Sequence, residues 1–165
     1  MRLFQYLLII LFASALFSCE NKNEQTTIYL VRHAEKDTTV KNDNPPLIQE
    51  GKERAERLVD ELADEKIKYI YSTKYDRNIN TVKPLSKAKN TEIQIYEWHK
   101  WEPMLDSLKT IPGTHVICGH GDNLLPMIDF LGTSVGKDEL GHQEYDNLFR
   151  VVLDGGDVSG EIVKF

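Results

Sequence analysis

The chain has 165 residues, of which 41% are apolar and 28% charged, so it can bury the core of one globular domain and is neither disordered nor fibrous. Its formal net charge of -6 argues against a nucleic-acid-binding protein, which normally presents a basic surface. An anionic small substrate is still compatible with this charge, because a few arginines in a cleft create a local positive field.

The N-terminal stretch has the pattern of an export signal. Residues 3–17 are mostly apolar, follow Arg2, and give way to polar residues too soon for a comfortable membrane span. Ser18-Cys19 then resembles the lipobox of bacterial lipoproteins, although Phe17 is bulkier than usual at its position. The resemblance implies that residues 1–18 are removed, that Cys19 is acylated, and that residues 19–26 form a polar tether. The domain of residues 27–165 would then be exported and lipid-anchored to a bacterial membrane, in the periplasm or at the cell surface; an uncleaved signal anchor or an ordinary signal peptide is the alternative.

Strands and helices are expected to alternate along the rest of the chain. The patterns predict strands at 27–31, 67–71, 92–96 and 114–118, and helices at 48–64, 76–88, 104–108 and 124–131. Pro84 is expected to kink or shorten the second helix. Residues 148–165 read as a hairpin around Asp154-Gly155-Gly156-Asp157. The alternation predicts an α/β fold whose sheet is mainly parallel, is covered on both faces, and ends in this antiparallel hairpin.

Basic and imidazole side chains directly follow three of the predicted strands. Arg32 and His33 follow the first strand, Arg77 follows the second, and His120 lies within Gly119-His120-Gly121 after the fourth. Because ligands of such sheets bind beyond the carboxyl ends of the strands, we expect these side chains to meet at one edge. Together they predict an anion site.

The residue types suit phosphoryl transfer. An arginine presents a planar fork of donors to phosphate oxygens and keeps its proton. A neutral imidazole is a competent nucleophile at phosphorus and forms a phosphohistidine. A second, protonated histidine can hold a phosphoryl oxygen as charge develops. We therefore expect His33 to attack the phosphate, His120 to stabilise it, and Arg32 and Arg77 to bind it.

The segment Leu30-Val31-Arg32-His33-Ala34-Glu35-Lys36 resembles the signature of the histidine phosphatase superfamily, which includes phosphoglycerate mutases and phosphohistidine phosphatases. Further similar blocks follow in the family's order: Pro46-Leu47 with Gly51, then Ser72, Arg77, Thr81 and Pro84, then Gly119-His120-Gly121. The resemblance runs from Ile28 to the final hairpin. It implies a three-layer α/β/α sandwich, phosphorylation of His33, and a phosphate pocket of Arg32, Arg77 and His120.

The chain departs from the family pattern at a few positions. Ala34 replaces the usual glycine, as in the shorter phosphohistidine-phosphatase-like members, and Ile48 stands where a threonine often caps the helix. Few residues separate the third strand from Thr114, so the insertions that shape a sugar-phosphate pocket in the mutases are missing. The resemblance therefore implies an open site.

The general acid has two candidates. Glu97, just past the third strand, lies about where the mutase-like branch of the family has its glutamate. Asp122 resembles the aspartate that follows the second histidine in the phytase-like branch, but here one residue is inserted between them. A carboxyl group in a dry pocket can hold its proton near neutral pH. We expect Glu97 to be the acid and keep Asp122 as the alternative.

Other polar and aromatic residues allow more than one interpretation. Lys36 and Gly121 are expected at the phosphate, although Lys36, like Glu35, is equally well explained as a solvated loop charge. Trp98 and Trp101 either line the substrate mouth or belong to a satellite of the core. Cys118 is expected to be a small buried residue rather than a nucleophile. The remaining histidines show no ligand spacing, so we expect no metal and no cofactor; they are His99, His115 and His142.

The sequence thus predicts a metal-independent phosphatase, a histidine acid phosphatase-type hydrolase that cleaves phosphomonoesters or phosphoramidates through a phosphohistidine on His33. Its expected partners are a small phosphorylated substrate or a phosphoprotein and, through the lipid anchor, a membrane. The alternatives are a phosphoglycerate mutase-like phosphotransferase and a catalytically silent lipoprotein that binds a phosphorylated ligand.

Overall fold

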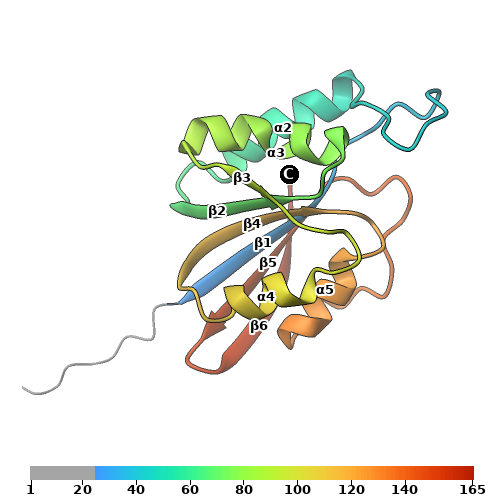
Figure 1. Cartoon of the computed structure of the whole chain (residues 1–165). Coiled ribbons are helices and arrows are strands. Elements are labelled where there is room, and N and C mark those ends of the chain that lie inside the picture. Colours follow the sequence, from blue (N-terminus) through green and yellow to red (C-terminus); the bar gives the residue numbers. More distant parts are fainter. Residues whose placement is uncertain (1–24) are drawn as a thin grey trace, which may run out of the picture.

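The computed structural model describes residues 25–165, which form one six-stranded sheet between two pairs of helices (Figure 1). The strands are β1 (Thr26–Arg32), β2 (Ile67–Ser72), β3 (Ile93–Ile95), β4 (Gly113–Gly119), β5 (Asn147–Asp154) and β6 (Asp157–Lys164). The helices are α2 (Gln49–Glu61), α3 (Asp76–Lys89), α4 (Glu102–Leu108) and α5 (Leu124–Leu131). The expected signal, Cys19 and most of the tether lie outside the described residues, and β1 begins one residue before the expected domain boundary.

The sheet is mainly parallel, as expected. Its strand order is β3-β2-β4-β1-β5-β6, and the first four of these strands run parallel to one another. β5 runs antiparallel to β1, and β6 pairs antiparallel with β5 to complete the C-terminal hairpin. The fold is therefore the predicted α/β/α sandwich with an antiparallel edge.

Alternate residues of the sheet point into two separate apolar cores. Ile28, Leu30 and Ile117 face α4 and α5, where Leu105, Leu124 and Met127 among others are fully buried. Tyr29, Val31 and Cys118 face α2 and α3 on the other side, with Leu58 and Leu85. This period-two alternation of strands that are buried on both faces explains why β1 reads as a continuous apolar run.

The alternative that Pro84 shortens α3 is wrong. α3 continues through Pro84 to Lys89 and ends at Asn90, which adopts a left-handed conformation with φ 50°. A proline within a helix costs about 3 kcal/mol. Val82 and Leu85, which are both fully buried against α2 and the sheet, offset that cost by keeping the helix packed on either side of the proline.

Several other boundaries differ slightly from the predicted ones. α2 ends at Glu61 rather than at residue 64, β3 has only three residues, and α4 begins two residues earlier than expected. Ile48 is the N-cap of α2 and makes no side-chain capping bond, which confirms the expected loss of a cap.

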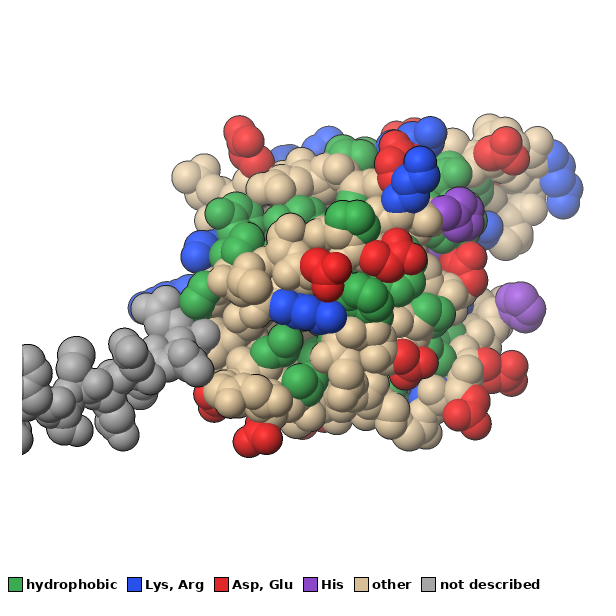
Figure 2. All heavy atoms as spheres, turned by 60° about the horizontal axis from the view of Figure 1, so that its bottom comes forward, with side chains coloured by type: hydrophobic (Ala, Val, Ile, Leu, Met, Phe, Trp, Pro, Cys, Tyr) green, Lys and Arg blue, Asp and Glu red, His purple; other side chains and the backbone are tan. Residues whose placement is uncertain are grey.

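The face that includes α4 and α5 carries acidic and basic side chains interspersed with apolar ones, and no continuous basic patch is visible on it (Figure 2). Among residues 25–165, no helix has the length and apolar character needed to cross a bilayer.

Candidate active site

His33 lies at the carboxyl end of β1, where the chain leaves the sheet. Its backbone N–H donates to the Gly119 carbonyl at 3.0 Å, and this bond ties the end of β1 to the end of β4. The Nδ1 atom of the ring lies 2.8 Å from the carbonyl oxygen of Ala34. Since a carbonyl can only accept, Nδ1 carries the proton of the neutral ring and leaves the lone pair on Nε2.

The His33 ring is buried beside positive charges. Only 4% of the residue is exposed, and burial lowers the pKa of His33 to about 4, with further lowering by Arg77 and Arg32. The imidazole is therefore neutral at physiological pH and has a free nucleophilic nitrogen.

His120 faces His33 from the end of β4. The two ring centroids are 5.5 Å apart, and Nε2 of His120 lies 3.0 Å from the hydroxyl oxygen of buried Thr73. Burial first, and then the charges of His33 and Arg77, lower the pKa of His120 to about 3. His120 is thus neutral in the free protein, whereas the expected protonated ring concerns the state in which the phosphoryl group is transferred.

Arg32 and Arg77 each have a free guanidinium nitrogen. Nη1 of Arg32 donates to the carbonyl oxygens of Gly141, His142 and Glu144 at 3.0, 3.2 and 3.3 Å. Nη1 of Arg77 donates to the Asp43 carbonyl at 3.0 Å. In both arginines Nε is buried and has no partner among the residues that the structure describes. Two buried donors of this kind, on cations beside His33, are suited to an anion.

A single cavity of about 530 Å³ joins these groups. Its lining residues include Arg32, His33, Lys36, Arg77, Trp98, His120, Gly121, Asp122, Asp138, Glu139 and His142. Desolvation and the charges of both arginines lower the pKa of Lys36, so its ammonium belongs to the same positive end. Six of the expected site residues thus meet at one cavity: Arg32, His33, Lys36, Arg77, His120 and Gly121.

The two candidate acids lie in different places. Asp122 is exposed and lines the cavity with both histidines. Glu97 is also exposed, but it lines a neighbouring pocket of about 320 Å³ with Thr73, Tyr75 and Tyr96 and does not line the histidine cavity. The geometry therefore favours Asp122, although the sequence favoured Glu97.

Each tryptophan fits a different one of the two roles considered above, the substrate mouth and the periphery of the core. Trp98 stacks on His120 at 4.2 Å between ring centroids and lines the histidine cavity. Trp101 instead packs edge-on against Phe130 at 5.5 Å and belongs to the periphery of the core. One tryptophan is at the site and the other is structural.

Glu35 is not a solvated loop charge. It is 8% exposed and accepts from Nε and Nη2 of Arg54, the shortest contact being 2.6 Å. Gly51 packs directly on the backbone of Glu35, where an added Cβ would lie 2.4 Å from the carbonyl oxygen. Only a glycine fits there, so α2 lies flush against the loop that follows His33.

The His120 turn is built from equally close contacts. Oδ1 of Asn123 accepts from the His120 N–H at 2.8 Å, and Nδ2 of Asn78 donates to the Gly119 carbonyl at 2.9 Å. A Cβ at Gly119 would come within 2.7 Å of Asn123 and Leu124. Sequence reasoning missed both asparagines, although Asn78 directly follows Arg77 and Asn123 comes three residues after His120, and this proximity was the available signal.

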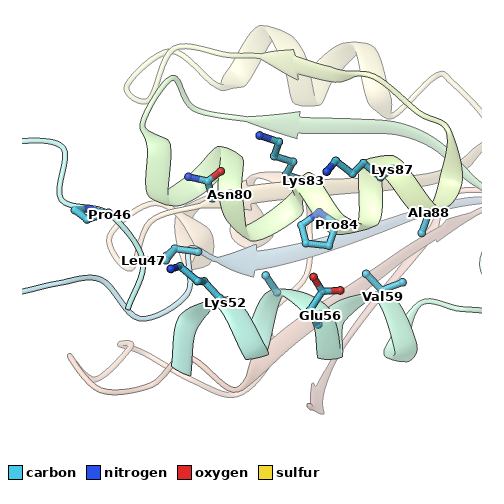
Figure 3. A pocket seen from close by; sticks show the side chains of 11 residues that line it. Pro46, Leu47, Lys52, Glu56, Val59, Asn80, Lys83, Pro84, Lys87 and Ala88 are labelled. Atoms are coloured by element: carbon cyan, nitrogen blue, oxygen red, sulfur yellow. The ribbon is translucent and has the colours of Figure 1, made fainter. Parts of the chain in front are cut away.

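A larger cavity, of about 770 Å³, lies between α2 and α3. Figure 3 shows Lys83, Pro84 and Lys87 on α3 across from Lys52, Glu56 and Val59 on α2. No histidine, cysteine or arginine lines it, so its size does not make it the reactive centre. Within residues 25–165, no three histidine, cysteine, aspartate or glutamate side chains gather as a metal site requires.

A comparison with family models agrees with the resemblance found in the sequence. Residues 28–102 match the family model described as the histidine phosphatase superfamily (branch 1). No curated protein matches the chain by sequence.

Solved structures with the same fold include two phosphatases and a mutase. Phosphoglycerate mutase from Bacillus anthracis aligns at a TM-score of 0.63 and 16% identity, covering 87% of this chain and 95% of that one. A putative phosphohistidine phosphatase SixA from Nakamurella multipartitia aligns at a TM-score of 0.58 and 16% identity, covering 87% of this chain and 96% of that one. A putative alpha-ribazole-5'-P phosphatase from Escherichia coli aligns at a TM-score of 0.62 and 10% identity, covering 85% of this chain and 97% of that one. Residues 28–102 are thus similar to the histidine phosphatase superfamily, and the solved structures show that the domain as a whole shares the fold of these proteins.

Proposed function

We propose that the protein is a phosphatase that hydrolyses phosphate monoesters or phosphoramidates through a phosphohistidine on His33. One observation carries the proposal: a neutral His33, with Nδ1 bonded to Ala34 and Nε2 free, shares a cavity with two arginines whose buried Nε atoms have no partner among the described residues. A nucleophile and the donors for its anionic target are thus in one place.

The first step transfers the phosphoryl group to the enzyme. The substrate phosphate lies against Arg32, Arg77 and Lys36, and Nε2 of His33 attacks phosphorus while the bond from phosphorus to the leaving oxygen or nitrogen breaks. Asp122, which lines the cavity, gives its proton to the leaving atom. Glu97 is the second candidate for this role, reached by a movement of the segment between β3 and α4.

The second step releases phosphate. A water molecule gives a proton to the same carboxylate and attacks phosphorus, the bond to Nε2 breaks, and His33 returns to its neutral form. His120 touches the phosphoryl oxygens throughout. A bound phosphate dianion counters the positive charges that lower the pKa of His120, so the proposal includes proton uptake by His120 when substrate binds.

The test uses the full chain, purified in mild detergent, with p-nitrophenyl phosphate and a metal chelator. We expect phosphate release, an acid-labile and base-stable label on the protein, and loss of turnover by more than about a thousandfold in His33→Asn. Asparagine can still donate to the Ala34 carbonyl, so this variant removes the nucleophile and keeps the local hydrogen bond. Full activity in His33→Asn, or an absolute metal requirement, would overturn the proposal.

The same assay distinguishes the alternatives. Transfer of phosphate to an organic acceptor with little free phosphate would indicate a mutase. Saturable binding of inorganic phosphate without turnover or a labelled histidine would indicate a binding protein.

A further inference from the structure

The histidine cavity is lined by charges of both signs. Arg32, Arg77 and Lys36 are its cations, and the charges that lower the pKa of His33 are all from these three residues. Asp138 and Glu139 line the same cavity with Asp122. Both are exposed, and neither forms an ion pair within the part of the chain that the structure describes. Their negative charge is therefore available to a ligand.

Asp138 and Glu139 belong to a loop that is fixed to the phosphate end. Nη1 of Arg32 donates to three carbonyl oxygens of residues 141–144, and Lys137 forms an ion pair with Glu144 at 2.9 Å. The second oxygen of Glu144 accepts from the Gly141 N–H at 2.7 Å. These bonds, on both sides of the two carboxylates, hold them beside the mouth of the cavity.

Apart from His142, the rest of the lining is apolar or aromatic. Trp98, Leu125, Pro126 and Leu140 line the cavity, and both faces of Trp98 are covered, one by His120 and the other by His99 at 4.6 Å. The lining therefore holds no further arginine or lysine for a second anionic group on the substrate. A substrate whose phosphate lies at the arginines has its leaving group among carboxylates and apolar surface.

We propose that the preferred substrates carry their phosphoryl group on a cationic organic group, such as an amino or quaternary ammonium alcohol, and that Asp138 and Glu139 select that charge. This inference rests on the proposed phosphatase function and narrows its substrate class. The carboxylates attract the cationic end through Coulomb interaction and repel a leaving group that carries a second phosphate or a carboxylate. In the reaction the P–O bond breaks, the alcohol oxygen takes a proton, and the cationic group is unchanged.

The experiment compares three phosphate monoesters that differ in the charge of the leaving group. These are phosphocholine, p-nitrophenyl phosphate and 3-phosphoglycerate, assayed with the full chain in detergent. In the wild type we expect the highest kcat/KM relative to intrinsic reactivity for phosphocholine and the lowest for 3-phosphoglycerate. In D138N/E139Q we expect the ratio of kcat/KM for phosphocholine to that for 3-phosphoglycerate to fall about tenfold, and p-nitrophenyl phosphate to change less than about twofold.

The chain offers a matched control in a second Asp-Glu pair. Asp60 and Glu61, at the far end of α2, are equally exposed and do not line the cavity. D60N/E61Q changes the net charge by the same amount, and we expect it to leave all three kcat/KM values unchanged. Raising the salt to 1 M should lower the wild-type ratio of kcat/KM for phosphocholine to that for 3-phosphoglycerate, as D138N/E139Q does.

The outcomes separate this inference from the function on which it rests. Turnover of p-nitrophenyl phosphate with no change in the charge ratio in D138N/E139Q overturns the inference alone. An equal change in D60N/E61Q also overturns it, because the effect would then come from net charge. Absence of turnover with all three esters overturns the phosphatase proposal and this inference together.

Discussion

At the scale of single residues, folding disfavours protonation of His33. Its pKa of about 4 in the folded protein lies below the 6.5 of an exposed histidine, mainly because of burial. Between these two pH values the unfolded chain binds a proton that the folded chain excludes, so the free energy of unfolding falls as the pH decreases from about 6.5 to about 4. His120, with a pKa of about 3, acts in the same direction.

This predicts that His33→Asn reduces the loss of stability in acid. Urea unfolding at pH 7 and at pH 4.5 gives the loss of unfolding free energy between these two pH values. We expect this loss to be smaller in His33→Asn than in the wild type, by on the order of 2 kcal/mol. An unchanged slope in His33→Asn would mean that the ring is protonated equally in both states.

At the scale of elements, one buried ion pair joins three parts of the chain. Arg54 of α2 binds Glu35, which follows the reactive histidine by two residues, and its Nη1 donates to the carbonyl of the C-terminal Phe165 at 3.1 Å. The side chains of Arg54 and Glu35 are 11% and 10% exposed. The His33 loop is thus held by a helix and by the end of β6.

We predict that Arg54→Met lowers the free energy of unfolding by about 3 kcal/mol, since it leaves the buried Glu35 carboxylate without its partner. Adding Glu35→Gln should recover much of that loss, because it removes the unpaired charge. The exposed pair of Lys164 and Asp146 provides the comparison, and Lys164→Met should cost less than about 1 kcal/mol. Chemical denaturation of the wild type and the three variants measures the differences; equal costs at the two sites would contradict the prediction.

At the scale of the whole molecule, the N-terminal segment bears on where in the cell the domain acts. Residues 1–24 are outside the described structure, and we propose on their sequence pattern that the protein is exported and anchored to a bacterial membrane through Cys19. Gln25 and the residues after it are already part of the fold, since the Gln25 carbonyl accepts from the Gly113 N–H at 3.1 Å. The proposed tether is therefore short.

This predicts that cells which express the full chain incorporate labelled palmitate into it, and that Cys19→Ser abolishes the label and moves the protein from the membrane to the soluble fraction. Cys118→Ser is the matched control. Its thiol is fully buried, burial raises its pKa to about 12, and the variant should keep the label. Label that persists in Cys19→Ser would rule out this cysteine as the anchor.

Sequence patterns were enough to predict the order of the strands and helices along the chain and the mainly parallel sheet. They also predicted that Arg32, His33, Arg77 and His120 meet at one site. They could do so because each of these side chains directly follows a strand or opens the next helix, and the carboxyl ends of parallel strands lie at one edge of the sheet. A local sequence pattern is sufficient to place a side chain at the site when that side chain's position is set by the strand next to it.

Features that depend on contacts between distant residues could be found only in the packed fold. The contact between Arg32 and the Gly141 carbonyl spans 109 positions and fixes the loop of Asp138 and Glu139. Trp98, after β3, stacks on His120, after β4, although β2 lies between these strands in the sheet. The neutral state of His120, the burial of Glu35 and the position of Glu97 outside the cavity have the same origin. Burial and the charges around a group are properties of the packed molecule, and no stretch of sequence contains them.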